Sequence, residues 1–157
     1  MDPQMAEAFR RIPYGIYVLT TQPGAESSAM IVSWVSQVSY SPPLLMVALR
    51  RNRPALPAIL ESDTFSLSLL SRDQKPFVDY LKKPTFQHQL SGLFGQTNQK
   101  GAPIIKEALA IWECRLFSRM EAGDHILLIG EVRSTMVNPE GKPLTTAEYG
   151  KTYIGQS

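Results

Sequence analysis

The chain of 157 residues has little of the chemistry on which most metal sites and disulfides depend. It contains one cysteine, Cys114, and two histidines. A disulfide within the chain is therefore excluded, and cysteine and histidine are too few for a typical zinc site. We predict no metal site. One unpaired thiol is typical of a protein in a reducing compartment.

Long apolar runs and a charge excess of one sign are missing too. The sequence has no run of about 18 apolar residues to cross a bilayer, and its N-terminus lacks the apolar stretch of a signal peptide. A formal net charge of +2 is far from the strongly basic surface of a nucleic-acid-binding protein. We expect a cytoplasmic protein with one domain, residues 1–157, that binds neither nucleic acid nor a membrane.

The sequence also lacks the glycine motifs of the common nucleotide-binding folds. Neither GxGxxG nor GxxxxGK[ST] is present, and the GxSxG motif of serine hydrolases is absent. With so few histidines and cysteines, an enzyme with this sequence is expected to depend on a bound cofactor for its chemistry.

What the sequence does contain is a series of short β-forming segments. They predict strands over residues 16–21, 29–40, 44–49, 65–70, 110–119 and 125–136. The apolar run at 44–49 is typical of a strand buried on both faces. Helices are predicted over residues 2–11, 54–61 and 73–81, a turn over 22–25, and mostly irregular chain over 82–103 and 138–157. This pattern predicts a mainly β fold, a β-barrel with a few short helices.

The segment 29–40 carries the first group of candidate site residues. Ser33, Ser36 and Ser39 recur along an otherwise apolar strand that also holds Trp34 and Gln37. Hydroxyl groups at these places suit hydrogen bonding to a flat polar ring lying against the strand. A solvated outer face of the sheet is the alternative explanation.

Two further groups of candidate site residues lie at the ends of predicted strands. The sequence RRNR at 50–53 lies between an apolar strand and a predicted helix, where guanidinium groups and a helix N-terminus suit a phosphate. A solvated basic loop is the alternative. Asp124 and His125 open the last strand, and a single histidine is more often structural than catalytic.

In order, these segments read PYGIYVLTT, AMIVSWVSQVSYSPPLLMVAL, RRNRPALPAILESDTFSLSLL, GAPIIKEALAIWECRL and EAGDHILLIGEV. Over about residues 6–135 the sequence resembles the flavin reductase-like family, whose fold is an FMN-binding split barrel. The serine strand leading into SPPL, and GDHILLIGEV, carry the resemblance most specifically. The WVSQVS variant is most similar to flavoredoxin-like members and to the flavin reductase modules of flavodiiron proteins.

The resemblance implies a homodimer with FMN near the subunit interface and NADH or NADPH as co-substrate. It implies that Arg50 and Arg53 approach the FMN phosphate, and that Asp124 and His125 lie near the reactive face of the flavin. His125 is the implied catalytic residue, which orients the nicotinamide or stabilises charge on the reduced ring. The implied contacts to the ring and ribityl chain are Met30, Ile31, Val32, Ser33, Trp34, Ser36 and Gln37.

The function that the resemblance implies is an NAD(P)H:flavin reductase that passes hydride to FMN, with an electron-acceptor protein or a monooxygenase as partner. An FMN-holding electron carrier without significant NAD(P)H turnover is the alternative. The sequence also departs from the family, with Ile31 in place of a common threonine, no threonine after Arg53, and Ser68 in place of a common asparagine. These departures leave open a third reading, a binding or structural dimer.

Overall fold

The computed structural model describes residues 1–21, 29–82, 94–95 and 101–151. The turn predicted over residues 22–25 and most of the loop predicted over 82–103 lie outside these residues. Among the described residues, the helices are all too short or too polar to cross a membrane.

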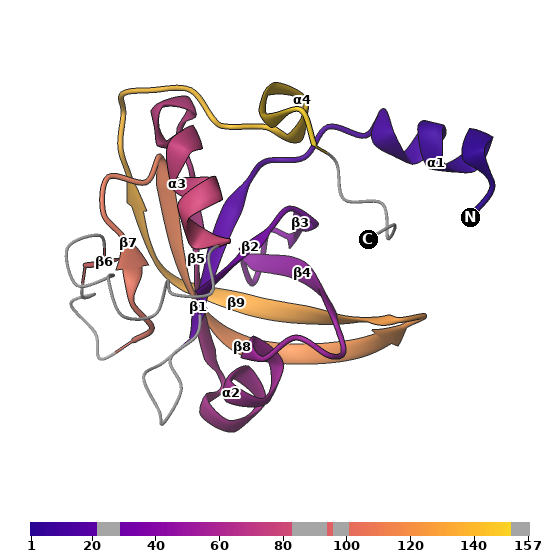
Figure 1. The fold of residues 1–157 in the computed structure, drawn as a ribbon. Helices are drawn as coiled ribbons and strands as arrows, with labels where there is room; N and C mark the ends of the chain where they lie inside the picture. Colours follow the sequence, from indigo (N-terminus) through magenta and orange to yellow (C-terminus); the bar gives the residue numbers. More distant parts are fainter. Residues whose placement is uncertain (22–28, 83–93, 96–100, 152–157) are drawn as a thin grey trace.

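A seven-stranded antiparallel sheet forms the body of the molecule, in the strand order β2-β1-β5-β8-β9-β4-β3 (Figure 1). Its strands are β1 (Tyr17–Thr21), β2 (Ala29–Val32), β3 (Val35–Ser39), β4 (Leu44–Arg50), β5 (Thr64–Leu69), β8 (Ala110–Ala122) and β9 (His125–Val137). Two short strands, β6 (Phe94–Gly95) and β7 (Ile104–Ile105), pair separately. The mainly β fold predicted from the sequence is confirmed.

The single strand predicted over residues 29–40 is wrong, because this segment forms two strands. β2 pairs with β1 and β3 pairs with β4, at opposite edges of the strand order, although only Ser33 and Trp34 separate them. The Ala48 amide donates to the Trp34 carbonyl at 3.0 Å, which fixes this connection to β4. One two-residue connection thus joins both edges of the sheet and curls it into a barrel. We call Ser33 and Trp34 the seam.

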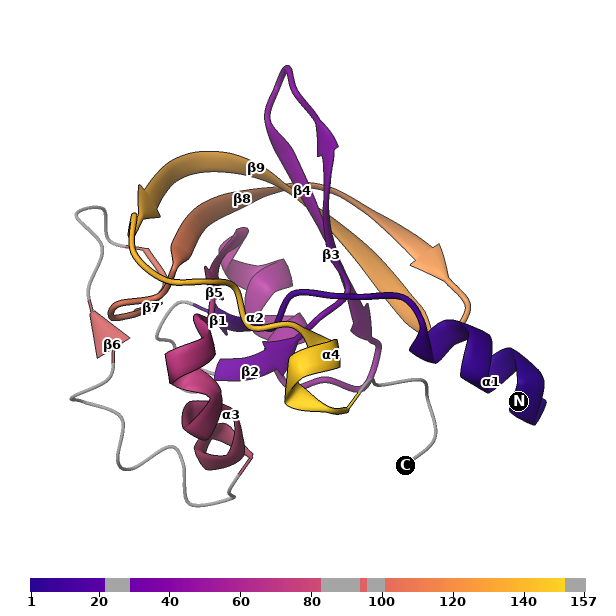
Figure 2. The same ribbon diagram turned by 90° about the horizontal axis from the view of Figure 1, so that it is seen from above.

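The long strands β8 and β9 arch across the molecule (Figure 2). Their pairing shifts register near Cys114 and again near Leu116, and such bulges bend a strand. At Gly130 of β9, an added Cβ would lie 2.5 Å from Cζ of Phe65 and 2.8 Å from Cβ of Cys114. The ring of Phe65 therefore occupies the place that a side chain at position 130 would need.

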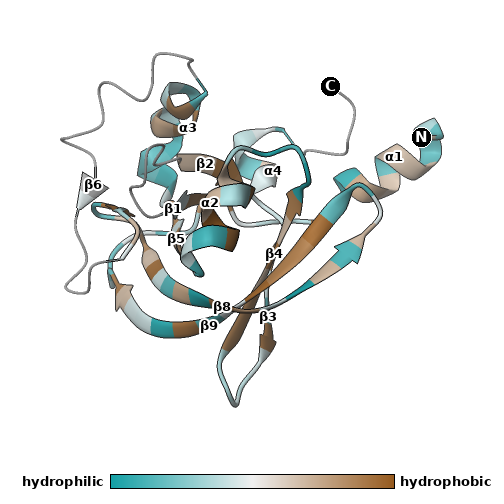
Figure 3. Cartoon of the chain, turned by 90° about the horizontal axis from the view of Figure 1, so that it is seen from below, coloured by the Kyte–Doolittle hydropathy of each residue, from teal (hydrophilic) through white to brown (hydrophobic). Residues whose placement is uncertain are grey.

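Two apolar cores lie on opposite faces of the sheet, as the neighbours Val18 and Leu19 of β1 illustrate. Leu19 belongs to the barrel core, which α2 (Ala55–Ser62) covers, and Val18 belongs to a second core under α3 (Lys75–Leu81). Hydrophobic residues run along β4 and the adjacent part of β9 (Figure 3).

Residues 44–49 are not buried on both faces as predicted. In β4, Leu45, Val47 and Leu49 are buried, whereas the alternate residues Leu44 and Met46 are only partly buried. The barrel core covers one face of the strand. The described residues provide no comparable layer over the other.

Hydroxyl groups on β1 and β5 hold the segment around residues 102–105 against the sheet. Thr20 donates to the Pro103 carbonyl, Ser66 donates to the Ala102 carbonyl at 3.4 Å, and the Ile105 amide donates to Ser68 at 3.2 Å. All three hydroxyl-bearing residues are buried. Ser68 thus has a structural role in this layer.

In the described part of the chain, four α-helices complement the sheet. α1 (Pro3–Arg10) begins at Asp2, which accepts hydrogen bonds from the Gln4 and Met5 amides, and it projects from the body (Figure 1). The predicted helices at 2–11, 54–61 and 73–81 correspond to α1, α2 and η1 (Arg72–Gln74) with α3. α4 (Thr146–Tyr149) lies in a segment predicted to be irregular, and a capping box of Thr145 and Glu148 starts it.

Candidate functional site

A groove of about 770 Å³ opens beside the seam, a size typical of small-molecule sites. Its walls come from five parts of the chain. They are residues 29–34 of β2 and the seam, residues 48–50 of β4 with residue 53 after it, His125 of β9, residues 78 and 81 of α3 with residue 82 after it, and residues 146 and 149 of α4 with residues 150–151 after it. Arg10 and Ile16 lie beside them.

The structure brings residues 30–34 into this groove but leaves Ser36 and Gln37 outside its lining. Both are exposed residues of β3. The Ser36 hydroxyl donates to the Gln37 carbonyl at 3.2 Å, and the Gln37 amide donates to the Ser39 carbonyl at 3.3 Å. Only the N-terminal part of the predicted serine strand therefore faces the groove, because the chain changes edges at the seam.

His125 lies in the groove wall, between Asp124 and Trp34. Its Nδ1 lies 2.7 Å from Oδ1 of Asp124, and its ring packs on the Trp34 ring with centroids 4.8 Å apart and planes inclined by 30°. The side chain of His125 is buried, whereas that of Asp124 is exposed and lies outside the lining.

The hydrogen bond from His125 lowers the pKa of the Asp124 carboxyl, and the charges of His125 and Arg50 lower it further. An ionised carboxylate only accepts hydrogen bonds, so Nδ1 of His125 carries the hydrogen in this contact. Nε2 is then the ring nitrogen left for a ligand. Asp124 acts on the groove through the orientation of His125.

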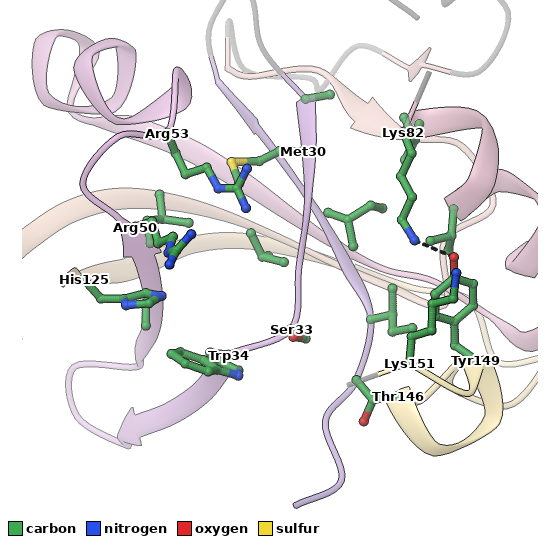
Figure 4. A pocket seen from close by; sticks show the side chains of 18 of the residues that line it. Met30, Ser33, Trp34, Arg50, Arg53, Lys82, His125, Thr146, Tyr149 and Lys151 are labelled. Carbon is green, nitrogen blue, oxygen red and sulfur yellow. Dashed lines mark hydrogen bonds between the residues drawn. The ribbon is translucent and has the colours of Figure 1, made fainter. Parts of the chain in front are cut away.

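Of the arginine cluster, Arg50 and Arg53 line the groove and Arg51 turns away to pair with Glu121. Arg50 is half-buried, pairs with His125 across β4 and β9, and has a guanidinium nitrogen 3.6 Å from Asp124. Arg53 is exposed at the start of α2. Figure 4 shows Arg50, Arg53 and His125 on one side of the groove.

The other side of the groove carries residues that the sequence analysis missed. Lys82, Tyr149 and Lys151 lie there (Figure 4). Lys82 donates to the Tyr149 hydroxyl at 2.5 Å, and that hydroxyl donates to Asp79 at 2.7 Å. The one available sequence signal was the TTAE capping box at 145–148, which predicts a helix start.

A family model described as flavin reductase like domain matches residues 9–155. The chain belongs to the flavin reductase-like family. It is 33% identical over 154 residues to diflavin flavoprotein A 1 of Synechocystis sp., a match that covers 96% of this chain and 27% of that protein. The chain spans about a quarter of the length of the first curated relatives that it matches.

Solved structures of flavin reductases have the same fold. NADH:FAD oxidoreductase SgcE6 of Streptomyces globisporus superposes with a TM-score of 0.83 at 26% identity, over 92% of this chain and 90% of that one. BorF, the flavin reductase component of a bacterial two-component tryptophan halogenase, gives a TM-score of 0.80 at 25% identity, over 96% of each chain.

The residues of the groove fit a flavin nucleotide. Arg50 and Arg53 provide fixed positive charge for a phosphate, and the partly buried apolar side chains of Met30 and Ile31 suit a planar ring. Ser33 offers a hydroxyl at the seam. Among the described lining residues, none is an aspartate or a glutamate that would repel a phosphate.

Proposed function

We propose that this protein is an NAD(P)H:flavin reductase that binds FMN in the groove and transfers electrons to it from NADH or NADPH. The single observation that carries the proposal is the groove at the seam, in which Arg50 of β4, Arg53 after it and His125 of β9 meet residues 30–34 in a member of this family. We also propose that residues 1–157 form one domain.

Each part of the groove has a role in this proposal. Arg50 and Arg53 bind the FMN phosphate, and residues 30–34 line the ring and the ribityl chain. The predicted contacts from Ser36 and Gln37 require a flavin that extends past the seam along β3. Asp124 is a positioning residue, because it holds Nδ1 of His125.

Bound flavin supplies the acceptor for the two electrons of NAD(P)H. The protein contributes orientation and a partly dry wall. His125, packed on Trp34 and held by Asp124, would present Nε2 to the nicotinamide or to the flavin edge and would orient the nicotinamide or stabilise charge on the reduced ring. In this role His125 is the catalytic residue.

The experiment that tests this proposal is spectroscopic. The protein, mixed with FMN and freed of excess, is expected to show flavin absorbance, and NADH or NADPH added without oxygen is expected to bleach it. FAD and riboflavin in parallel identify the preferred flavin. A protein without flavin absorbance at any flavin concentration would contradict the proposal and favour a binding or structural dimer.

A second candidate is an FMN-holding electron carrier that exchanges electrons with a protein and hardly oxidises NAD(P)H itself. The observation that favours it is the match to one quarter of diflavin flavoproteins, where a domain like this one is part of a longer chain. NAD(P)H oxidation with added free FMN separates the two candidates, because only a reductase turns over.

The proposal also covers the partner protein, the oligomeric state and the location in the cell. BorF is named as the reductase component of a two-component halogenase, and we propose a comparable partner here, a monooxygenase or another electron-acceptor protein. We also propose a homodimer and a cytoplasmic location, the latter because Cys114 is unpaired.

A further inference from the structure

The groove has positive charge at two separate places. Five of its described lining residues are arginine or lysine and none is acidic, in a chain whose 16 basic residues are nearly balanced by 14 acidic ones. Arg50 and Arg53 lie on one side and Lys82 and Lys151 on the opposite side, with Ser33 between them (Figure 4). The proposed FMN phosphate needs only one of these sides.

The Lys82 ammonium is held in place before any ligand arrives. It donates to the Tyr149 hydroxyl at 2.5 Å and lies 4.5 Å from the centre of the Tyr149 ring, in a cation–π contact. The Tyr149 hydroxyl in turn donates to Asp79. An ordered ammonium loses less side-chain entropy on binding an anion than a freely rotating one does.

Lys151 is brought to the same side by the end of α4. Gly150 has φ +81°, a left-handed conformation that favours glycine and ends the helix. The chain then turns so that Gly150 and Lys151 both line the groove. The charges of Lys82, Lys151 and Lys75 all lower the pKa of Asp79, after the larger effect of its hydrogen bond from Tyr149. Positive charge thus exceeds negative charge around this corner.

We propose that Lys82 and Lys151 form a second anion site in the groove, which binds the diphosphate of an adenine dinucleotide. The inference rests on the proposed function, because a reductase must accommodate NAD(P)H beside its flavin. NAD(P)H and FAD both contain an adenosine diphosphate half. The shared ligand chemistry is therefore ADP, and FMN does not contain it.

The test measures ADP binding to the protein with and without FMN, using wild type, Lys151→Gln and the double variant Lys82→Gln/Lys151→Gln. We expect the dissociation constant for ADP to rise about tenfold in the double variant, equal to about 1.4 kcal/mol. Lys151→Gln alone is expected to give a smaller increase. Lys82→Arg in place of Gln should restore ADP binding in part, because the positive charge returns.

The matched control is Lys142→Gln, which removes the same charge from an exposed residue outside the groove lining. It should leave ADP affinity unchanged, and the affinity for FMN should stay within about twofold in every variant. Equal ADP affinity in the double variant and the control, or no ADP binding by wild type, would overturn the inference. A wild-type protein that binds ADP but not FMN would instead contradict the proposed function.

Two further measurements on the same variants identify the source of the diphosphate. If the KM for NADH or NADPH rises and the FAD dissociation constant does not, the site binds the nicotinamide dinucleotide. If only FAD binding weakens, the site binds the adenosine half of the flavin. Both results support the anion site.

Discussion

At the scale of single residues, Arg53 offers the cleanest test of the phosphate assignment. Its side chain is exposed at the groove, and no partner for it is found within the described residues. Arg53→Ala should therefore weaken FMN binding by about 1.5–3 kcal/mol, the range for hydrogen bonds to charged groups. Riboflavin has no phosphate, and its affinity should hardly change. Flavin fluorescence titration measures both affinities.

Arg51 supplies the matched control for this substitution. It is two positions away but pairs with Glu121 outside the groove lining. Arg51→Ala should leave both affinities near those of the wild type. Equal weakening of FMN and riboflavin by Arg53→Ala would show that the arginine acts through the fold.

His125 allows a catalytic role to be separated from a structural one. If Nε2 contacts the nicotinamide or the flavin edge, His125→Ala should slow anaerobic bleaching of bound flavin by NAD(P)H about tenfold or more, equal to about 1.4 kcal/mol of activation free energy. FMN affinity and the melting temperature should change little. A falling melting temperature with a normal bleaching rate would mean that His125 serves the packing of Trp34 instead.

Cys114 should be chemically inert in the folded protein. It is buried, and burial raises the pKa of its thiol from an ordinary value of 9.0 to about 12. A thiolate-specific reagent at pH 8 should therefore react slowly with the native protein and quickly with protein unfolded in guanidinium. Rapid reaction of the native protein would contradict this burial.

The same pKa difference gives a direction to stability against pH. Below about pH 9 the thiol is protonated in both states and contributes no dependence. Between about pH 9 and 12 the unfolded state loses this proton while the folded state keeps it, so the free energy of unfolding falls as pH rises. In a Cys114→Ala variant this part of the pH dependence should vanish.

At the scale of elements, the packing of β9 against Phe65 of β5 and Cys114 of β8 depends on Gly130. An added methyl group would meet the ring of Phe65 at 2.5 Å and Cβ of Cys114 at 2.8 Å in a packed core. Gly130→Ala should therefore destabilise the protein by about 1–3 kcal/mol, the usual cost of overpacking. Guanidinium unfolding measures this loss.

A double variant shows whether the cause is the close approach of Phe65. Phe65→Leu should be destabilising on its own, but combined with Gly130→Ala the loss should be smaller than the sum of the two. Strictly additive losses would mean that the approach to Cβ of Cys114, and not the contact with the Phe65 ring, causes the destabilisation.

The same scale shows which parts of the fold were predictable from the sequence. β-forming residues marked β1, β4, β5, β8 and β9 correctly, because each of these strands packs apolar side chains on a core. The break at Ser33 and Trp34 was not visible, because no glycine or proline interrupts residues 29–40 and the break follows from pairing with distant strands. Local propensity carries no information on that pairing.

The residues of the groove also divide into those that the sequence predicted and those that it did not. Local motifs and the family resemblance point to residues 30–34, Arg50, Arg53 and His125, all of which line the groove. Lys82 and Tyr149 were missed because their meeting depends on a hydrogen bond between positions 67 residues apart. The exposure of Ser36 and Gln37 was missed for a related reason, since the change of sheet edge at the seam directs β3 away from the groove.

At the scale of the whole molecule, apolar side chains remain exposed on α1. Met5 and Phe9 of this helix, which projects from the body, are exposed, and so is Ile12 just after it (Figures 1 and 2). The outer face of β4 is only partly covered as well. A second copy of the chain would bury such surfaces, as the proposed homodimer requires.

Sedimentation velocity at micromolar concentration should therefore show a dimer. Phe9→Asp is expected to shift the protein toward monomer, because it places a charge on the apolar face of α1. Gln4→Asp introduces the same charge on this helix outside the apolar face and should leave the dimer intact. A monomeric wild type would contradict the proposal directly.

The seam determines where local opening of the barrel requires the least free energy. In the described sheet each strand pairs with its neighbours in the order from β2 to β3, but β2 and β3 do not pair with each other; there the Ala48–Trp34 hydrogen bond and the covalent connection bridge the two edges. Local opening is cheapest where backbone hydrogen bonds are fewest, so amide hydrogens near this point should exchange with deuterium faster than those of the β8–β9 ladder. A ligand in the groove would contact both edges of the sheet at once. It would therefore restrain both edges and slow amide hydrogen exchange in β2 and at Ala48 together.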